Sequence, residues 1–330
     1  MSNSLHKPPA QPVMTECDRR FPLPTPVPDE GSTNQRRQRQ QIRPLRRVFL
    51  ILPALPKVAD LSLICFTLLT QSAVGLVFFT TMGHWLSGAT QADISFRSMS
   101  LALGITTAGL LVALSHLAAP RLAPHALRNP ATSWLSREVL LVPFFAAALG
   151  LAVLATLLGS PAFRISMEIA ACLLGGAALW AMTGVYLLKT VPAWNTPATA
   201  LEFTGSALLL GGALSAVLTS FETAGWSPAL NPAAAGMFLG LVIKLAAIKP
   251  AMQAERAARD QLWYQQPTFT LSAGRTLAMR SVLNVAGVAV TLAAANKSLQ
   301  LGLFSGLVIL VTGEVLGRLR FYRLYGRIGL

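Results

Sequence analysis

Two ionisable residues border a polar segment between two long apolar stretches of the chain. His116 ends the first stretch and Glu138 begins the second. Modest burial brings the pKa of a carboxyl group or an imidazole towards neutrality, so this pair could exchange the protons that two-electron quinone chemistry requires. A carboxylate at a helix start is equally explained by the favourable helix dipole. From residue types alone, the functional and the structural interpretation both stay open.

Long apolar helices are the elements that would hold these residues. Apolar residues make up 53% of the 330-residue chain and charged residues only 12%, against about a quarter charged in soluble proteins. The apolar stretches are continuous rather than alternating, which excludes strands, and several reach the roughly 20 residues that a membrane span needs. We therefore predict an all-α integral membrane protein, a bundle of eight transmembrane helices. Their expected cores are residues 61–84, 98–117, 139–159, 166–188, 200–221, 232–249, 281–296 and 301–321.

The first 56 residues form a separate compositional zone. They contain ten of the 21 prolines, and an arginine-rich cluster follows the prolines at residues 36–47. This composition predicts a disordered cytoplasmic tail held near anionic lipid, and a docking arm for a partner protein is the alternative. Residues 57–330 are then the eight-helix membrane domain.

The positive charges are distributed unevenly between the two sides of the predicted bundle. With eight spans, 24 of the 27 Lys and Arg residues fall on the side of both termini, and only Arg97, Arg164 and Lys297 fall on the other. The positive-inside rule therefore predicts a multi-pass protein of the bacterial inner membrane with both termini in the cytoplasm. Lipid headgroups and topology also explain the net charge of +14, so we expect no nucleic-acid partner.

The sequence offers few residues that could hold a redox cofactor. Its three cysteines, Cys17, Cys65 and Cys172, lie far apart, and the histidines do not form pairs deep in facing helices. We expect no metal, iron–sulfur or haem site built by this chain alone.

The segment that ends at Glu138 resembles a known family. His116-Leu-Ala-Ala-Pro120 followed by Thr132-Ser-Trp-Leu-Ser-Arg-Glu138 is similar to the membrane anchor subunit of dimethyl sulfoxide (DMSO) reductase. Three further segments support the resemblance, which covers about residues 60–325. These segments are Leu68–Gly75, Thr190–Pro197 and Gly313–Tyr322.

The resemblance implies a quinone-reactive subunit without its own redox cofactor. It would assemble with an iron–sulfur subunit and a molybdopterin catalytic subunit, and exchange electrons with the quinone pool. The family's quinone-site histidine and glutamate fall on His116 and Glu138, with Gln71 and Arg137 as weaker candidates. Arg256 and Arg259, in a loop expected at 250–280, are a plausible docking surface for the iron–sulfur subunit.

The substrate of such a complex is open. Because the predicted cytoplasmic orientation departs from the exported reductase, the protein is most similar to the anchor of the cytoplasmic-facing membrane-bound sulfite dehydrogenase, which would pass electrons from sulfite to quinone. The alternative is the anchor of a DMSO-type reductase that oxidises menaquinol. A small-molecule transporter is a distant alternative, because the sequence lacks paired broken helices and a visible internal repeat.

Several other residues have structural interpretations. Glu314 and Arg318, four residues apart on one helix, are expected to form an ion pair. Lys244 is expected to reach the membrane surface with its long side chain. The pairs Gly175-Gly176 and Gly211-Gly212 are expected to allow close helix packing.

Overall fold

The fold was analysed in a computed structural model, which describes residues 58–87, 92–115, 127–222, 228–261 and 273–324. Within these ranges the chain is helical and contains no strand, which confirms the all-α prediction. The tail expected over residues 1–56 and the candidate His116 lie outside the described residues. The helices are α2 (Val58–Ser87), α3 (Ala92–Ser115), α4 (Trp134–Leu157), α5 (Pro161–Tyr186), α6 (Pro197–Glu222), α7 (Asn231–Ala246), α8 (Ile248–Gln261), α9 (Ala273–Asn296) and α10 (Gln300–Arg323), with a short 3-10 turn at Pro228–Leu230.

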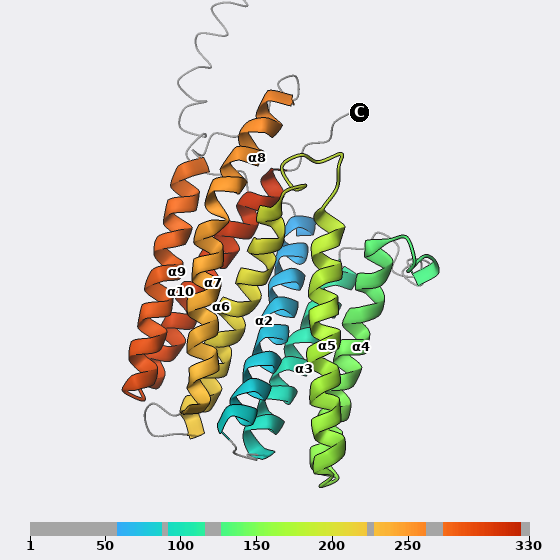
Figure 1. Ribbon diagram of the computed structural model, residues 1–330, viewed down its shortest axis with the longest axis vertical. Coiled ribbons are helices and arrows are strands. Elements are labelled where there is room, and N and C mark those ends of the chain that lie inside the picture. The colour runs from blue at the N-terminus through green and yellow to red at the C-terminus, as the bar shows by residue number, and fades with distance from the viewer. Residues whose placement is uncertain (1–57, 88–91, 116–126, 223–227, 262–272, 325–330) are drawn as a thin grey trace, which may run out of the picture. The chain divides into compact units, whose positions relative to one another are not determined.

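Eight helical segments of the described residues are long and apolar enough to cross a membrane. Seven of them lie in single helices. The remaining segment, Asn231–Ala258, runs through α7 into α8. This confirms the predicted number of spans and a multi-pass membrane protein. We call the end of the bundle at which α4 and α6 begin and α10 ends the upper end, as in Figure 1.

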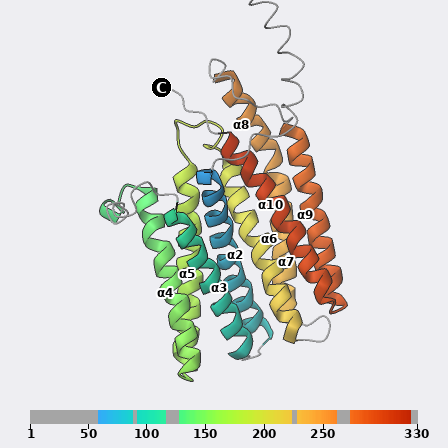
Figure 2. The same ribbon diagram turned by 180° about the vertical axis from the view of Figure 1, so that it is seen from behind.

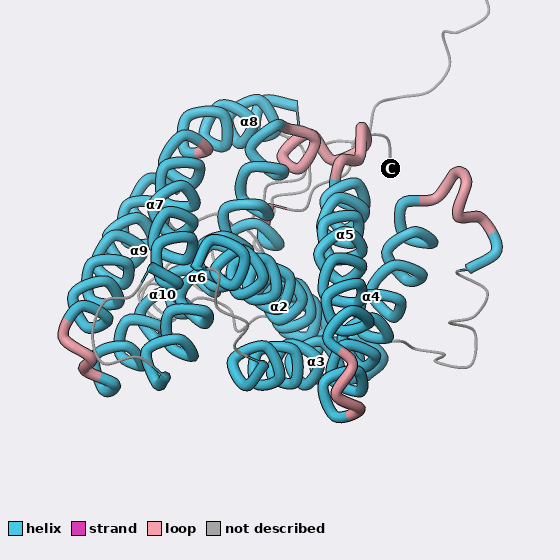
Figure 3. Tube along the Cα trace, turned by 60° about the horizontal axis from the view of Figure 1, so that its bottom comes forward, coloured by secondary structure: helices cyan, strands magenta, loops and turns pink. Residues whose placement is uncertain are grey.

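Helices α2 and α6 lie at the centre of the bundle. They pack against each other, and 72% and 67% of their apolar windows are buried, more than in any other span. Helices α3, α4 and α5 cover one side of this central pair and α7, α9 and α10 cover the other (Figures 2 and 3). Antiparallel α4 and α5 form one tight pair, and α9 and α10 form another.

Glycines allow the two central helices to approach closely. A Cβ atom at Gly75 would overlap the carbonyl of Ala207 and the Cα of Gly211, and one at Gly211 would overlap Gly75. The prediction for Gly211-Gly212 is therefore confirmed, because a Cβ atom at Gly212 would also lie too close to Ala233 and Met237. Gly175 packs closely against Phe145 and Val74.

Three expectations about packing and boundaries are wrong. No atom of the described residues lies within 4 Å of a Cβ placed at Gly176, so this glycine does not serve close packing among them. Helix α9 begins at Ala273 rather than near residue 281, because the charged Arg280 is buried and paired inside the bundle instead of ending the span. The first part of the expected 250–280 loop is the helix α8, which continues upward from α7 (Figure 1).

Candidate functional site

The start of α4 is fixed by hydrogen bonds in the preceding loop. The hydroxyl of Ser133 caps the helix by accepting a bond from the backbone N–H of Ser136. The guanidinium of Arg137 donates to the carbonyls of Pro130 and Ala131, at 2.8 and 2.7 Å, and lies 4.3 Å from the centre of the Trp134 ring. The loop and the first turn of α4 therefore hold each other in place, just ahead of Glu138.

Glu138 is a buried carboxyl group near the upper end of the bundle. Its side chain faces the interior, and the residue is only 6% exposed. No hydrogen bond or ion pair of this carboxyl group is found in the described part of the chain. A buried carboxyl group without a partner is costly, which makes Glu138 the strongest candidate for contact with a bound ligand.

A pair of tyrosines lies in the same part of the bundle as Glu138. The hydroxyl oxygens of Tyr186, the last residue of α5, and Tyr322, on α10, are 2.7 Å apart and share a hydrogen bond. Both phenol groups lie within electrostatic range of Glu138. This arrangement follows from the antiparallel packing of α4 and α5, in which the ring of Trp134 rests against Gly184. Glu138 and the tyrosine pair together form the candidate quinone site.

Gln71 on α2 is fully buried behind the tyrosine pair. Its side-chain oxygen accepts a 2.7 Å hydrogen bond from Arg318, and its nitrogen donates to the sulfur of Met182. The guanidinium of Arg318 also lies 3.7 Å from the centre of the Phe203 ring, one turn of α10 before Tyr322. Gln71 therefore positions Arg318, and both of its polar atoms are occupied.

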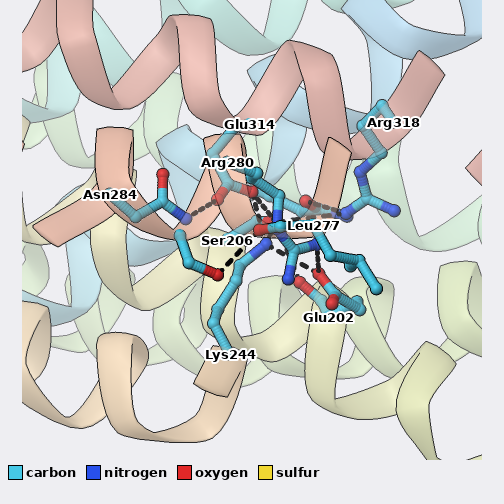
Figure 4. A network of polar contacts seen from close by, with 10 residues as sticks. Glu202, Ser206, Lys244, Leu277, Arg280, Asn284, Glu314 and Arg318 are labelled. Atoms are coloured by element: carbon cyan, nitrogen blue, oxygen red, sulfur yellow. Dashed lines mark hydrogen bonds and ion pairs between the residues drawn. The ribbon is translucent and has the colours of Figure 1, made fainter. Parts of the chain in front are cut away.

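A buried ionic network adjoins Arg318 and joins α6, α7, α9 and α10 (Figure 4). Lys244 of α7 pairs with Glu202 of α6 at 3.0 Å and with Glu314 of α10. Arg280 of α9 donates to the same Oε2 atom of Glu202 at 2.7 Å. These four side chains connect three helices to the central α6.

Two neutral residues complete this network. The hydroxyl of Ser206 donates to Glu314 and accepts bonds from Lys244 and Arg318, at 2.8 and 3.3 Å. The amide of Asn284 donates to the other oxygen of Glu314 at 2.9 Å. The polar groups therefore run without a break from Gln71 through Arg318 to Lys244.

The network overturns two expectations. Lys244 is only 3% exposed and does not extend to the membrane surface, because two carboxylates hold its ammonium group inside the bundle. Glu314 and Arg318 do not pair with each other, because each finds partners on neighbouring helices instead. Contacts across helices are therefore preferred here over the pairing along one helix.

A second buried polar cluster lies at the lower end of the bundle, between α3 and α5. Arg164 and Glu168 form an ion pair at 2.9 Å within α5, and the hydroxyl of Ser95 donates to the same carboxylate. These residues bind α3 to α5 far from the candidate quinone site.

The docking candidates lie on or near α8. Arg256 is exposed on this helix, whereas the side chain of Arg259 lies outside the described residues. Glu255 on the same helix is buried and pairs with Arg320 of α10 at 2.5 Å. This ion pair fixes α8 against the end of α10, so that its exposed face is held in a defined position.

Reasoning from the sequence missed the ionic network and the tyrosine pair. The sequence did contain a sign of the network. Several charged residues fall inside otherwise apolar spans, at a similar distance from the upper end of the bundle. Such residues usually face the bundle interior and pair with one another. The missed residues are Tyr186, Glu202, Ser206, Arg280, Asn284 and Tyr322, together with the true partners of Lys244, Glu314 and Arg318.

Comparisons with known proteins identify relatives of this protein. Residues 57–324 match the family described as DMSO reductase anchor subunit (DmsC). The sequence is 28% identical over 288 residues to the anaerobic dimethyl sulfoxide reductase protein YnfH of Escherichia coli K12, a match that covers 81% of this chain and 95% of the relative. It is also 28% identical over 163 residues to a component of the anaerobic dimethyl sulfoxide reductase of Haemophilus influenzae, a match that covers 48% of this chain and 58% of the relative.

These relatives bear on the alternatives that the sequence left open. Both are named as parts of an anaerobic dimethyl sulfoxide reductase, so they favour the reductase alternative and give no support to the sulfite-oxidising subtype. The transporter alternative likewise finds no support among them. From its eight apolar spans and the match over most of its length, the chain belongs to the family of DMSO reductase membrane anchor subunits.

Proposed function

We propose that this protein is the quinone-reactive membrane anchor of a DMSO-reductase-type complex, which oxidises a quinol and passes its electrons to an iron–sulfur partner subunit. The observation that carries the proposal is Glu138, a buried carboxyl group without a described partner, within electrostatic range of the hydroxyl pair of Tyr186 and Tyr322. Membership of the anchor family supports it.

The proposed reaction needs a proton acceptor at the quinol headgroup. Oxidation of a quinol releases two electrons and two protons. Glu138 would accept a hydroxyl proton of the quinol, because a carboxylate held in an apolar site is a suitable general base. The tyrosine hydroxyls would hydrogen-bond to the headgroup and fix its orientation. Since Glu138 lies near the upper end of its span, the proton has a short path to the aqueous phase.

The remaining candidates have supporting roles in this proposal. Gln71 positions Arg318 through its side-chain oxygen and stays a weaker candidate for contact with the headgroup. Arg137 fixes the loop before α4. His116 stays a candidate for the second proton because the resemblance assigns it that position, although it lies outside the described residues.

The electrons would leave through partner subunits. An iron–sulfur subunit at the upper end would accept them, and a molybdopterin catalytic subunit would use them to reduce the substrate. The exposed face of α8, which includes Arg256, is the docking surface that we propose for the iron–sulfur subunit, and Arg259 on the same helix stays a candidate from the sequence. The anchor itself would provide the quinol site and the membrane attachment.

Sulfite oxidation is a second candidate, and one observation favours it. The basic residues Lys249, Arg256 and Arg275 belong to the upper end, whereas Arg97, Arg164 and Lys297 lie towards the lower end. The positive-inside rule then directs the upper end, with Glu138, to the cytoplasm. In this orientation an inner-membrane protein would serve cytoplasmic catalytic subunits, as in the membrane-bound sulfite dehydrogenase.

Turnover of the assembled complex tests the proposed function. In Glu138→Gln, reduction of the terminal substrate by a quinol should fall by about 100-fold, because the general base is lost. A reduced viologen dye, which gives electrons directly to the partner subunits, should still drive the reaction at the wild-type rate. Equal quinol-driven rates in the variant and the wild type would remove Glu138 from the site.

A further inference from the structure

A small cavity opens beside the ionic network at the upper end of the bundle. It has a volume of about 30 Å³ and is lined from α6, α7, α8, α9 and α10 and from the segment before α6. This cavity has room for a few water molecules or for one monatomic ion. Glu138, Tyr186 and Tyr322 are not among its lining residues, which separates it from the candidate quinone site.

The charges around the cavity do not cancel. Its lining includes two carboxylates, Glu202 and Glu314, and three cations that pair with them or lie beside them, Lys244, Arg280 and Arg318. A fourth cation, Arg320, is neutralised by Glu255. The charged residues that line the cavity, taken together with Glu255, therefore leave one positive charge in excess, and an uncompensated charge inside a membrane protein is costly.

Two of these cations also have a hydrogen-bond donor without a partner. The Nε atoms of Arg280 and Arg320 are buried and donate to no group of the described residues. Arg280 as a whole is only 3% exposed. Ala198 and Thr199, at the start of α6, line the same cavity, and the positive end of a helix dipole favours an anion there.

We propose that this cavity binds one small monovalent anion, of the size of a halide ion. The anion would accept hydrogen bonds from the two Nε–H groups and cancel the excess charge. The Oε1 atom of Glu202, which is also buried without a partner, would take a hydrogen bond from a neighbouring water. The bound anion would stabilise the four-helix contact around Lys244, independently of any reaction at Glu138.

Thermal unfolding of the full-length protein in detergent tests this site. The melting temperature is measured in chloride, bromide and methanesulfonate at equal ionic strength. The proposal predicts a rise of a few degrees that saturates with chloride or bromide and is absent with the larger methanesulfonate, because binding to the folded state alone raises stability by mass action. Anomalous scattering from crystals grown in bromide should give a peak in the cavity.

Matched variants assign the effect to the cavity. Ala251→Leu fills the cavity without changing its charge, and Ala257→Leu adds the same bulk on the exposed face of α8. The halide response should be lost in Ala251→Leu and kept in Ala257→Leu. Arg280→Gln removes both the excess charge and one donor, so its response should also be lost.

Three results would overturn the proposal. Equal melting temperatures in all three salts would mean that the cavity holds water only. A rise that does not saturate and is equal in every variant would mean general ionic screening. Stabilisation by added anionic phospholipid but not by halide would assign the positive site to a lipid headgroup.

Discussion

The hydroxyl groups of Tyr186 and Tyr322 share a 2.7 Å hydrogen bond that joins the end of α5 to α10. The two helices belong to opposite sides of the central pair α2 and α6. Because Glu138 lies within electrostatic range of both hydroxyls, this bond connects the candidate quinone site to the half of the bundle that carries the ionic network.

Removal of one hydroxyl from this pair should affect quinol chemistry more than stability. In Tyr322→Phe the ring and its packing against Trp194 remain, and a lost neutral hydrogen bond costs about 1 kcal/mol of the free energy of unfolding. We expect a several-fold higher KM for quinol with a nearly unchanged melting temperature. Steady-state kinetics with quinol and with reduced viologen measure the effect. A purely structural role for Tyr322 would lower both activities together, through loss of assembled complex.

The ionic network should be essential for the folded bundle. Glu314→Gln removes one of the two carboxylates that hold Lys244, and breaking a buried ion pair costs about 3–5 kcal/mol. We expect a clear drop in melting temperature and in the yield of folded protein from the membrane. Arg256→Gln is the control, because Arg256 is exposed on α8 and should tolerate the change. Similar melting temperatures for the two variants would show that the network contributes little to stability.

The close contact of α2 and α6 predicts a sharp difference between two glycine variants. Gly75→Ala places a methyl group against the carbonyl of Ala207 and forces the central helices apart. Gly176→Ala adds the same group where no atom of the described residues lies within 4 Å. Folded yield and melting temperature in detergent should fall in the first variant and stay unchanged in the second. A normal melting temperature for Gly75→Ala would contradict the observed packing.

The orientation of the bundle can be measured directly. Reporters active only in the cytoplasm or only in the periplasm are fused separately after residue 330 and within residues 222–231. The charge distribution predicts a cytoplasmic carboxyl terminus and an external 222–231 segment. This outcome would favour cytoplasmic catalytic subunits and sulfite oxidation, and the reverse outcome would favour an exported DMSO-type reductase.

The number of membrane helices could be predicted from the sequence because few backbone structures are stable in lipid. In lipid, the backbone N–H and C=O groups of a single apolar segment must form their hydrogen bonds within that segment. A continuous apolar stretch of sufficient length therefore becomes a helix. The boundaries of α9 were missed for a related reason. Arg275 and Arg280 interrupt the apolar pattern, and only the position of Glu202 on another helix shows that Arg280 can be buried.

The candidate site could be predicted only in part. A resemblance directed attention to Glu138, and the structure adds its burial and its two tyrosine neighbours. The neighbours are 48 and 184 residues away in the sequence, so no local pattern connects them to Glu138. Pairing along one helix was predicted for Glu314 and Arg318, but partners on facing helices depend on helix rotation and order, which the sequence pattern alone does not specify.

Quinone binding is the most direct test of the central claim, that Glu138 belongs to the quinol site. A fluorescent quinol analogue is titrated into the purified complex of the wild type, Glu138→Gln and the control Lys297→Gln, which changes an exposed residue at the lower end of the bundle. We predict that Glu138→Gln weakens binding at least tenfold, the effect of losing roughly 1.4 kcal/mol of interaction, while the control binds as the wild type does. Unchanged affinity in Glu138→Gln, in a complex that still assembles, would contradict the account.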